Sequence, residues 1–254
     1  MPPIRSTPGQ IWRVTLARPE ARNAVTEDML SSLRSALADA AVDPGARVVV
    51  LDSEGPDFCA GADLDELERA VTGPEAASYG RTLDEVLGAI VEHTLPVIAK
   101  VRGAALGAGC QLVLAADLAI AATDARIGVP SARLGLVMGF ASIRRLVAAV
   151  GSKRAAEMLL GGRALSGGEA SAAGLVNAAV AEDALGVAVE ELAAAVARGA
   201  PLSVRASKRG IGLAAAGLDR GEFEMLSAAA FGSDDLKEGL RAFRERRSPE
   251  FQGR

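Results

Sequence analysis

Short apolar runs alternate with a helical pattern along the first half of the chain. Thr26–Ala41 has apolar residues three to four positions apart, and Glu27 and Asp28 in its first turn favour the positive end of a helix dipole. Glycine-bearing turns separate the apolar runs from their neighbours. Four runs predict strands: Ile11–Leu16, Val48–Ser53, Pro96–Val101 and Leu118–Ala122. Parallel strands with helical crossovers, and hence the α/β class, are the expected outcome.

From Phe140 onward the pattern predicts helices almost throughout. Ala188–Ala197 (AVEELAAAVA) predicts a packed helix, because alanine is the best helix former. We therefore divide the chain into an α/β core, residues 1–195, and a helical C-terminal region, residues 196–254. Breaks are expected at Gly161-Gly162, Gly167-Gly168, Pro201 and Gly232-Ser233.

Composition narrows the classes of function. A net charge of −4 over 254 residues argues against nonspecific nucleic-acid binding, which needs a basic surface. Cys59 and Cys110 have neither metal-ligand nor CxxC spacing, so we expect no metal site and no disulfide scaffold. The sequence has no hydrophobic signal core and no apolar run of roughly 18 residues. We expect a soluble protein of the reducing cytoplasm.

Two glycine-containing segments each follow a predicted strand and lead into a helical pattern. Phe58–Leu67 reads FCAGADLDEL, and Val101–Leu112 reads VRGAALGAGCQL. Either segment alone is better explained as a simple chain reversal. Such turns let a ligand approach the backbone, and the first amides of a helix lack internal partners. If the two turns face each other, their amides can stabilise a thioester oxygen as it becomes an enolate.

Together these segments resemble the two signature segments of the enoyl-CoA hydratase/isomerase (crotonase) superfamily. The resemblance runs nearly end to end and implies a crotonase (ClpP-like) fold of repeated ββα units with a helical C-terminal trimerisation region. It implies an acyl-CoA-binding core over residues 1–195, a homotrimer or homohexamer, and no cofactor beyond the coenzyme A of the substrate. Supporting matches are PVIAKVRGAALGAGCQLVLAADLAIA from Pro96, RPEARNAV from Arg18, LSGGEASAAGLVNAAV from Leu165 and DDLKEGLRAFRERRSPEF from Asp234.

The resemblance also implies roles for individual residues. The amides of Ala62 and Ala108 match the family's oxyanion hole. The family usually has Gly where Ala108 stands, so its methyl group narrows the acyl pocket without removing the donor. Arg133 falls near the acyl pocket, where it would recognise an acidic acyl group or bond to the backbone or a neighbouring subunit. Arg18 and Arg22 are candidates for binding the CoA phosphates, with solvated surface arginines as the alternative. The residues expected to bind substrate or CoA are Arg22, Ala24, Ala60, Asp63, Leu64, Leu106, Arg133, Phe243 and Arg246.

The chain departs from the family at both acid/base positions. Gln111 and Ser131 stand where the related hydratases have glutamates, and neither is a carboxylate base. We expect His93 to lie on the surface and Cys110 to fill a small buried space. The acidic residues after the first turn, Asp63, Asp65, Glu66 and Glu68, are expected to face solvent, with Asp63 capping the helix.

Three functions fit these residues. The first is a hydratase- or isomerase-type enzyme that passes through an enolate, using water or an unidentified carboxylate. The second is a crotonase-type decarboxylase of a malonyl-type thioester, in which loss of CO₂ generates the enolate directly. The third is a noncatalytic acyl-CoA-binding protein, because the ligand cradle is retained while both carboxylates are lost.

Overall fold

The computed structural model describes residues 2–72, 78–217 and 221–254, and in this part of the chain the main sheet has six strands. β1 and β2 pair antiparallel, and every other neighbouring pair is parallel. The predicted strands and the α/β class are confirmed. The strand order is β1 (Ile4–Thr7), β2 (Ile11–Leu16), β3 (Val48–Ser53), β4 (Val97–Val101), β6 (Leu118–Ala122) and β9 (Ala178–Val180).

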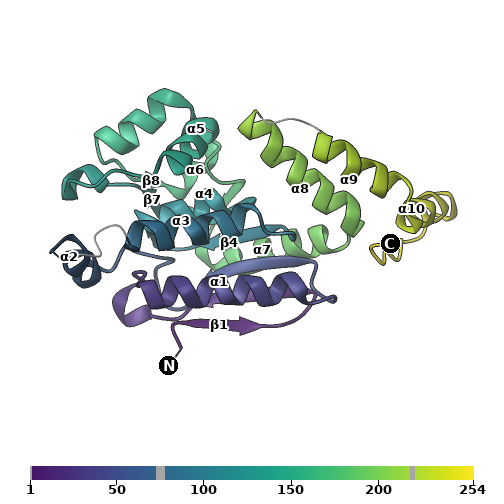
Figure 1. Cartoon of the computed structure of the whole chain (residues 1–254), viewed down its shortest axis with the longest axis horizontal. Coiled ribbons are helices and arrows are strands. Elements are labelled where there is room, and N and C mark those ends of the chain that lie inside the picture. The colour runs from purple at the N-terminus through teal and green to yellow at the C-terminus, as the bar shows by residue number, and fades with distance from the viewer. Residues whose placement is uncertain (1, 73–77, 218–220) are drawn as a thin grey trace.

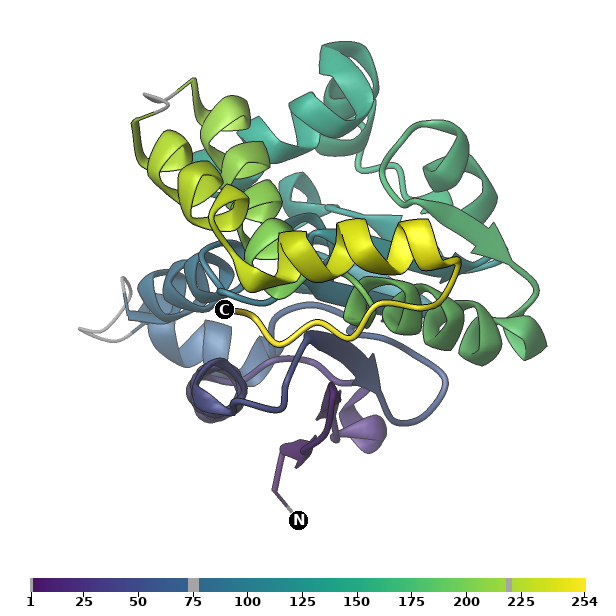
Figure 2. The same cartoon turned by 90° about the vertical axis from the view of Figure 1, so that its right-hand side faces the viewer.

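Helices cover both sides of this sheet (Figures 1 and 2). α1 (Glu27–Val42) packs against α3 (Ser78–Val91) and on β1 and β2, whereas α7 (Glu182–Ala197) crosses β2, β3, β4 and β6. Thr26 caps α1 by accepting a hydrogen bond from the Met29 amide at 3.1 Å. The predicted helix is therefore confirmed. Its buried face consists of residues at helical spacing, Met29, Leu30, Leu33, Ala36, Leu37 and Ala40.

A smaller sheet of three strands leads into helix α4 (Ala108–Ala115). It is formed by β5 (Ala104–Leu106), β7 (Arg126–Gly128) and β8 (Leu165–Ser166). β8 and β9 lie in the half of the chain that was predicted to be helical, so that prediction is wrong for these two segments. Each is only two or three residues long, which is too short to carry a periodic signal.

The break predicted at Gly167 is the start of a helix. α6 (Gly167–Ala172) begins with a capping box, in which Ser166 and Glu169 each accept a hydrogen bond from the other's amide. A Cβ atom on Gly167 would lie 1.9 Å from the carbonyl oxygen of Ala122, in β6. The glycine therefore permits close packing of the helix on the sheet.

The last three helices lie together at one end of the molecule (Figure 1). They are α8 (Pro201–Ala216), α9 (Gly221–Phe231) and α10 (Asp234–Glu245). Earlier in the chain, α5 (Phe140–Leu160) has a kink at Gly151. The division predicted after residue 195 falls inside the last turn of α7, which ends at Ala197. The division itself stays a prediction. Within the described residues, every helix is too short or too polar to cross a membrane.

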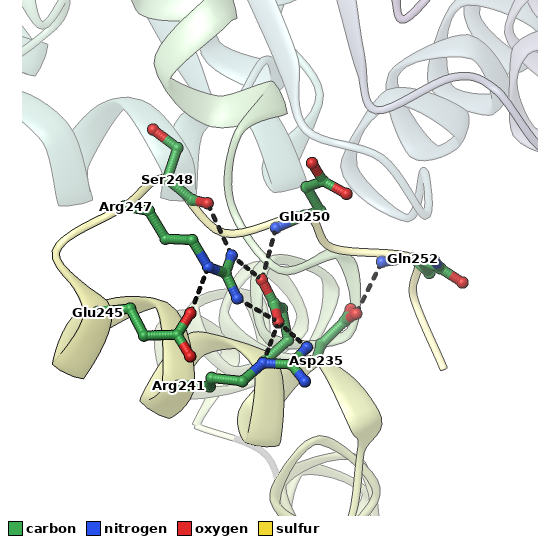
Figure 3. A network of polar contacts seen from close by, with 8 residues as sticks. Asp235, Arg241, Glu245, Arg247, Ser248, Glu250 and Gln252 are labelled. Carbon is green, nitrogen blue, oxygen red and sulfur yellow. Dashed lines mark hydrogen bonds and ion pairs between the residues drawn. The ribbon is translucent and has the colours of Figure 1, made fainter.

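The C-terminal segment folds back along α10, as Figure 2 shows. Asp235 accepts a hydrogen bond from the Gln252 amide at 2.7 Å (Figure 3) and another from the Gly253 amide at 2.8 Å. Glu238 accepts from Arg241 and Arg247, and these hydrogen bonds hold the pKa of its carboxyl far below the ordinary value. Carboxylates of α10 thus fix the end of the chain.

Candidate active site

The two glycine-containing turns face each other. The first ends at α2 (Leu64–Thr72) and the second at α4. The Leu106 amide donates to the Cys59 carbonyl oxygen at 2.9 Å, and a Cβ atom on Gly107 would lie 3.7 Å from the Cα of Gly61. Gly107 has φ +54° and ψ −114°, a conformation that side chains rarely permit. The juxtaposition expected from the sequence is therefore present.

In the first turn, the amide of Ala62 has no acceptor among the described residues. Its neighbours on both sides are engaged: the Val25 amide donates to the Gly61 oxygen at 2.8 Å, and the Asp63 amide donates to the Val25 oxygen at 2.9 Å. Because this parallel bridge uses the groups on either side of Ala62, the Ala62 N–H points away from Val25. It is left available to a ligand.

In the second turn, Ala108 is the first residue of α4, where a helix amide has no internal acceptor. Its N–H likewise makes no hydrogen bond in the described part of the chain. The Gly107 amide is held by the Gly128 oxygen at 2.9 Å, and the Gln111 amide donates back to Gly107 at 3.1 Å. These bonds fix the first turn of α4 and leave the Ala108 N–H free.

Both amides belong to residues lining a cavity of about 710 Å³. Two unengaged N–H groups in the lining of one cavity can bind an oxygen that gains negative charge, provided that both point to it. Ten of the site residues expected from the sequence line this cavity: Arg22, Ala24, Ala60, Ala62, Asp63, Leu64, Leu106, Ala108, Gln111 and Ser131. Sequence reasoning missed the apolar part of the wall, which includes Leu67, Ala70, Leu83, Val129, Leu136 and Met138. An acyl chain can pack against that part.

Neutral polar side chains occupy the two cavity positions at which the resemblance leads one to expect glutamates. Gln111 is 8% exposed, and its side-chain amide has no hydrogen-bond partner among the described residues. Ser131 begins the 3₁₀ helix Ser131–Leu134 and is half-buried, and its hydroxyl also has no partner there. These two side chains therefore offer hydrogen bonds without a charge.

The acidic residues after the first turn have different environments. Asp63 caps α2 by accepting from the Glu66 amide at 3.3 Å, as predicted, but it also pairs with Arg18 at 3.3 Å. Glu66 accepts from the Glu27 amide at 2.7 Å. The solvent-facing orientation expected for Asp63 and Glu66 is thus wrong, because other segments engage both carboxylates. Asp65 and Glu68 are exposed, as predicted.

His93 is buried, so its predicted surface position is wrong. Its Nε2 lies 2.9 Å from the Leu37 carbonyl oxygen in α1, and its Nδ1 lies 3.1 Å from the Leu95 amide. Burial lowers the pKa of His93 from its ordinary value. Cys110 is buried as predicted, and burial raises the pKa of its thiol to about 12. Neither residue lines the cavity.

The two arginines proposed for CoA phosphates differ in availability. Arg18 donates to the Ala24 carbonyl oxygen at 2.8 Å and pairs with Asp63, so the protein itself engages its guanidinium. Arg22 pairs with Asp57 through Nε at 2.6 Å, and 57% of its side chain remains exposed. Only Arg22 lines the cavity.

Three expected site residues lie outside the cavity lining. Arg133 packs its side chain over Gly162, whose Cβ would lie 3.0 Å from the arginine Nε. Phe243 is exposed on α10, and Arg246 ends that helix with φ +55°. α10 and α2 are at opposite ends of the molecule (Figure 1), so Phe243 and Arg246 do not reach this cavity within one chain. Their predicted contact with a neighbouring subunit stays a prediction.

Comparison with known proteins settles the family. The enoyl-CoA hydratase/isomerase family model matches residues 6–254. The chain belongs to the enoyl-CoA hydratase/isomerase family. It is 34% identical to the 2,3-dehydroadipyl-CoA hydratase of Escherichia coli K12, over 99% of this chain and 98% of that protein. It is 37% identical to the mouse mitochondrial enoyl-CoA hydratase domain-containing protein 2, over 96% of this chain and 85% of that protein.

Solved structures agree on the fold. The enoyl-CoA hydratase of Bacillus anthracis superimposes with a TM-score of 0.90 at 30% identity, covering 99% of this chain and all of that one. The enoyl-CoA hydratase of Mycobacterium smegmatis gives 0.86 at 33% identity, with 99% of each chain covered. The predicted crotonase fold is confirmed. Family membership supports an enzyme that acts on acyl-CoA thioesters.

Proposed function

We propose that the protein binds acyl-CoA thioesters and stabilises their enolates between the amides of Ala62 and Ala108. The observation that carries this proposal is the pair of unengaged N–H groups on facing turns at one wall of a 710 Å³ cavity. Removing one such donor typically costs about 10²–10³-fold in rate. Ala108 also lies at the positive end of α4, which adds to the stabilisation.

The cavity wall supports a division of the ligand into two parts. The apolar surface from Leu83, Val129 and Met138 suits the hydrocarbon of an acyl group. Arg22 and Leu64 also line the cavity, and 57% of the Arg22 side chain is exposed, so we expect the polar CoA portion to lie against them. The noncatalytic alternative accounts equally for such binding, so turnover has to be measured directly.

The reaction must proceed without the two usual carboxylates. General acid–base catalysis contributes about 10²–10⁴-fold per group, so replacement by Gln111 and Ser131 lowers ordinary hydration strongly. Both side chains can still hold a water molecule against an enoyl group. A slow hydratase or isomerase is the function that this arrangement and the family membership support best.

A second function, decarboxylation of a malonyl-type thioester, is supported by the neutral side chain of Gln111. A carboxylate on C2 next to the Gln111 amide would find a neutral donor where the related hydratases have a glutamate. Cleavage of the bond between C2 and this carboxylate releases CO₂ and leaves its electron pair in the C1–C2 double bond. The negative charge moves to the thioester oxygen between Ala62 and Ala108, and water then protonates C2. This sequence needs no general base.

Self-association belongs to the same proposal. Large apolar side chains are exposed on the C-terminal helices, including Ile211, Met225, Phe231 and Phe243. Burial of such side chains is a main source of association energy. These side chains favour self-association, and family membership leads us to propose a homotrimer, alone or paired into a hexamer. The absence of a disulfide framework in the sequence leads us to propose a cytoplasmic location.

The test combines binding, polarisation and turnover. A dimethylaminocinnamoyl-CoA probe should bind with its absorbance moved to longer wavelength, because two amides draw electrons toward its carbonyl. Ala108→Pro removes one N–H at a helix position where proline is tolerated, and should lose most of that movement. Glu182→Pro, at the first position of α7 and exposed, is the matched control and should keep it.

Turnover then separates the two reactions. Crotonyl-CoA and a 3-enoyl-CoA report hydration and isomerisation through thioester absorbance, and methylmalonyl-CoA reports decarboxylation through product mass. Binding of the probe without turnover of any of the three would favour the noncatalytic reading. If no CoA thioester binds at millimolar concentration, the proposal is wrong.

A further inference from the structure

Arg22 and Asn23 form a short segment of unusual backbone geometry before the first turn. Both have positive φ, +53° and +54°, which residues other than glycine rarely adopt. Asn23 is fully buried, and its Nδ2 donates to the carbonyl oxygens of Glu54 and Asp57, each at 2.8 Å. Its Oδ1 accepts from the Arg18 amide at 2.8 Å. Three hydrogen bonds from one side chain thus hold this geometry in place.

Asp57 extends the connection to the second turn. Its Oδ2 accepts from Arg22 Nε at 2.6 Å, and its Oδ1 accepts from the Ala104 amide at 2.7 Å. The Arg22 guanidinium holds the pKa of the Asp57 carboxyl below its ordinary value, so the carboxylate stays charged and its hydrogen bonds are charge-assisted. One side chain therefore touches both segments that lead to the cavity.

The Ala62 and Ala108 amides are only a few residues away in sequence from residues that these hydrogen bonds hold. The Arg22 carbonyl oxygen accepts from the Ala60 amide at 3.0 Å, two residues before Ala62. Ala104 begins β5, and Ala108 follows four residues later. Displacement at either contact would therefore reach one amide and change its distance from the other.

We propose that Asn23 and Asp57 act as a polar clamp that sets the separation of the Ala62 and Ala108 amides. They are positioning residues, since neither lines the cavity. This inference rests on the proposed function, because the separation matters only if both amides bind one oxygen. A purely structural role would lower stability and leave the polarisation of a bound thioester unchanged.

The experiment measures that polarisation with the dimethylaminocinnamoyl-CoA probe. Asn23→Gly keeps the backbone geometry accessible and removes the three side-chain hydrogen bonds, while Asp57→Asn removes the ion pair and is the milder change. Asn177→Ala is the matched control. Its amide oxygen accepts from the Ala119 amide of β6 at 2.8 Å, and Asn177, directly before β9, does not line the cavity.

Both clamp variants should bind the probe but lose at least half of its wavelength shift, whereas Asn177→Ala should keep the full shift. For any turnover detected, kcat should fall by about tenfold or more with KM changed far less, because the amides act mainly in the transition state. A full shift in both folded clamp variants overturns the inference, and if Asn23→Gly does not fold, Asp57→Asn decides alone. Absence of any shift in the wild-type protein would instead refute the proposed function.

Discussion

Gly109, the second residue of α4, offers the sharpest test of how the two turns are packed. A Cβ atom there would lie 2.3 Å from the carbonyl oxygen of Cys59 and 2.9 Å from its Cβ. The oxygen belongs to the backbone and cannot rotate aside, so α4 must retreat by about 1 Å to reach the 3.4 Å of ordinary contact in Gly109→Ala. The same oxygen accepts the Leu106 hydrogen bond at 2.9 Å. The retreat therefore strains the contact between the turns.

The expected cost follows from overpacking. Forcing an extra methyl group into a packed site costs about 1–3 kcal/mol, and the gain in helix propensity is at most ~1 kcal/mol. Gly88→Ala is the matched control, because Gly88 lies within α3 and its Cβ would meet no atom within 4 Å. That substitution should stabilise the protein by about 0.5–1 kcal/mol.

Urea denaturation gives both free energies of unfolding, and the cinnamoyl-CoA probe reports on the amides. Gly109→Ala should be less stable than wild type and should also lose part of the wavelength shift, since Ala108 moves with α4. Gly88→Ala should retain the shift in full. A Gly109→Ala protein that is as stable as wild type, with an unchanged shift, would refute the packing argument.

Three further predictions concern side chains. Burial lowers the pKa of His93 below 6.5, so the unfolded chain binds the proton more readily than the folded one. The free energy of unfolding should therefore fall as the pH drops below about 6.5. His93→Gln should weaken that pH dependence, as urea melts would show. Burial raises the pKa of the thiols of Cys59 and Cys110 to about 12. Iodoacetamide near pH 8 should therefore label them only in denaturant, as intact-mass measurement would show. Labelling of the native protein would contradict this. Gln111→Glu combined with Ser131→Glu should raise crotonyl-CoA hydration by about 10²-fold or more, with Gln111→Glu alone as the comparison; no gain in a folded double variant would count against the shared cavity wall.

The sequence predicts a strand well where five or six consecutive residues form one buried run. β2, β3 and β6 coincide with the predicted runs, because five or six consecutive residues suffice to show a buried strand. β8 and β9 cannot be found this way. Their pairing depends on strands β7 and β6, which are distant along the chain.

The sequence likewise predicts the local features of the candidate site and misses those that depend on contacts between distant segments. Glycine turns before helices mark Ala62 and Ala108 through local backbone geometry, and the resemblance specifies which amides to consider. His93 lies in the loop after α3, and its buried position depends on a carbonyl group of Leu37 in α1, 56 positions away. Its place in the sequence shortly before Pro96 could not show this. The part of the apolar wall that α2 and α3 supply was not predicted either, because only folding brings those helices next to the two turns.

Backbone and side-chain functions respond differently to substitution. An amide donor survives any residue except proline, so Ala108 keeps its N–H although the family usually has glycine there. A carboxylate base does not survive replacement, and Gln111 and Ser131 supply no substitute. The buried Gln111 amide, which has no partner among the described residues, must then find one in a bound water or in the ligand. Under the proposed function, a water there would favour addition to an enoyl group, and a ligand carboxylate there would favour loss of CO₂.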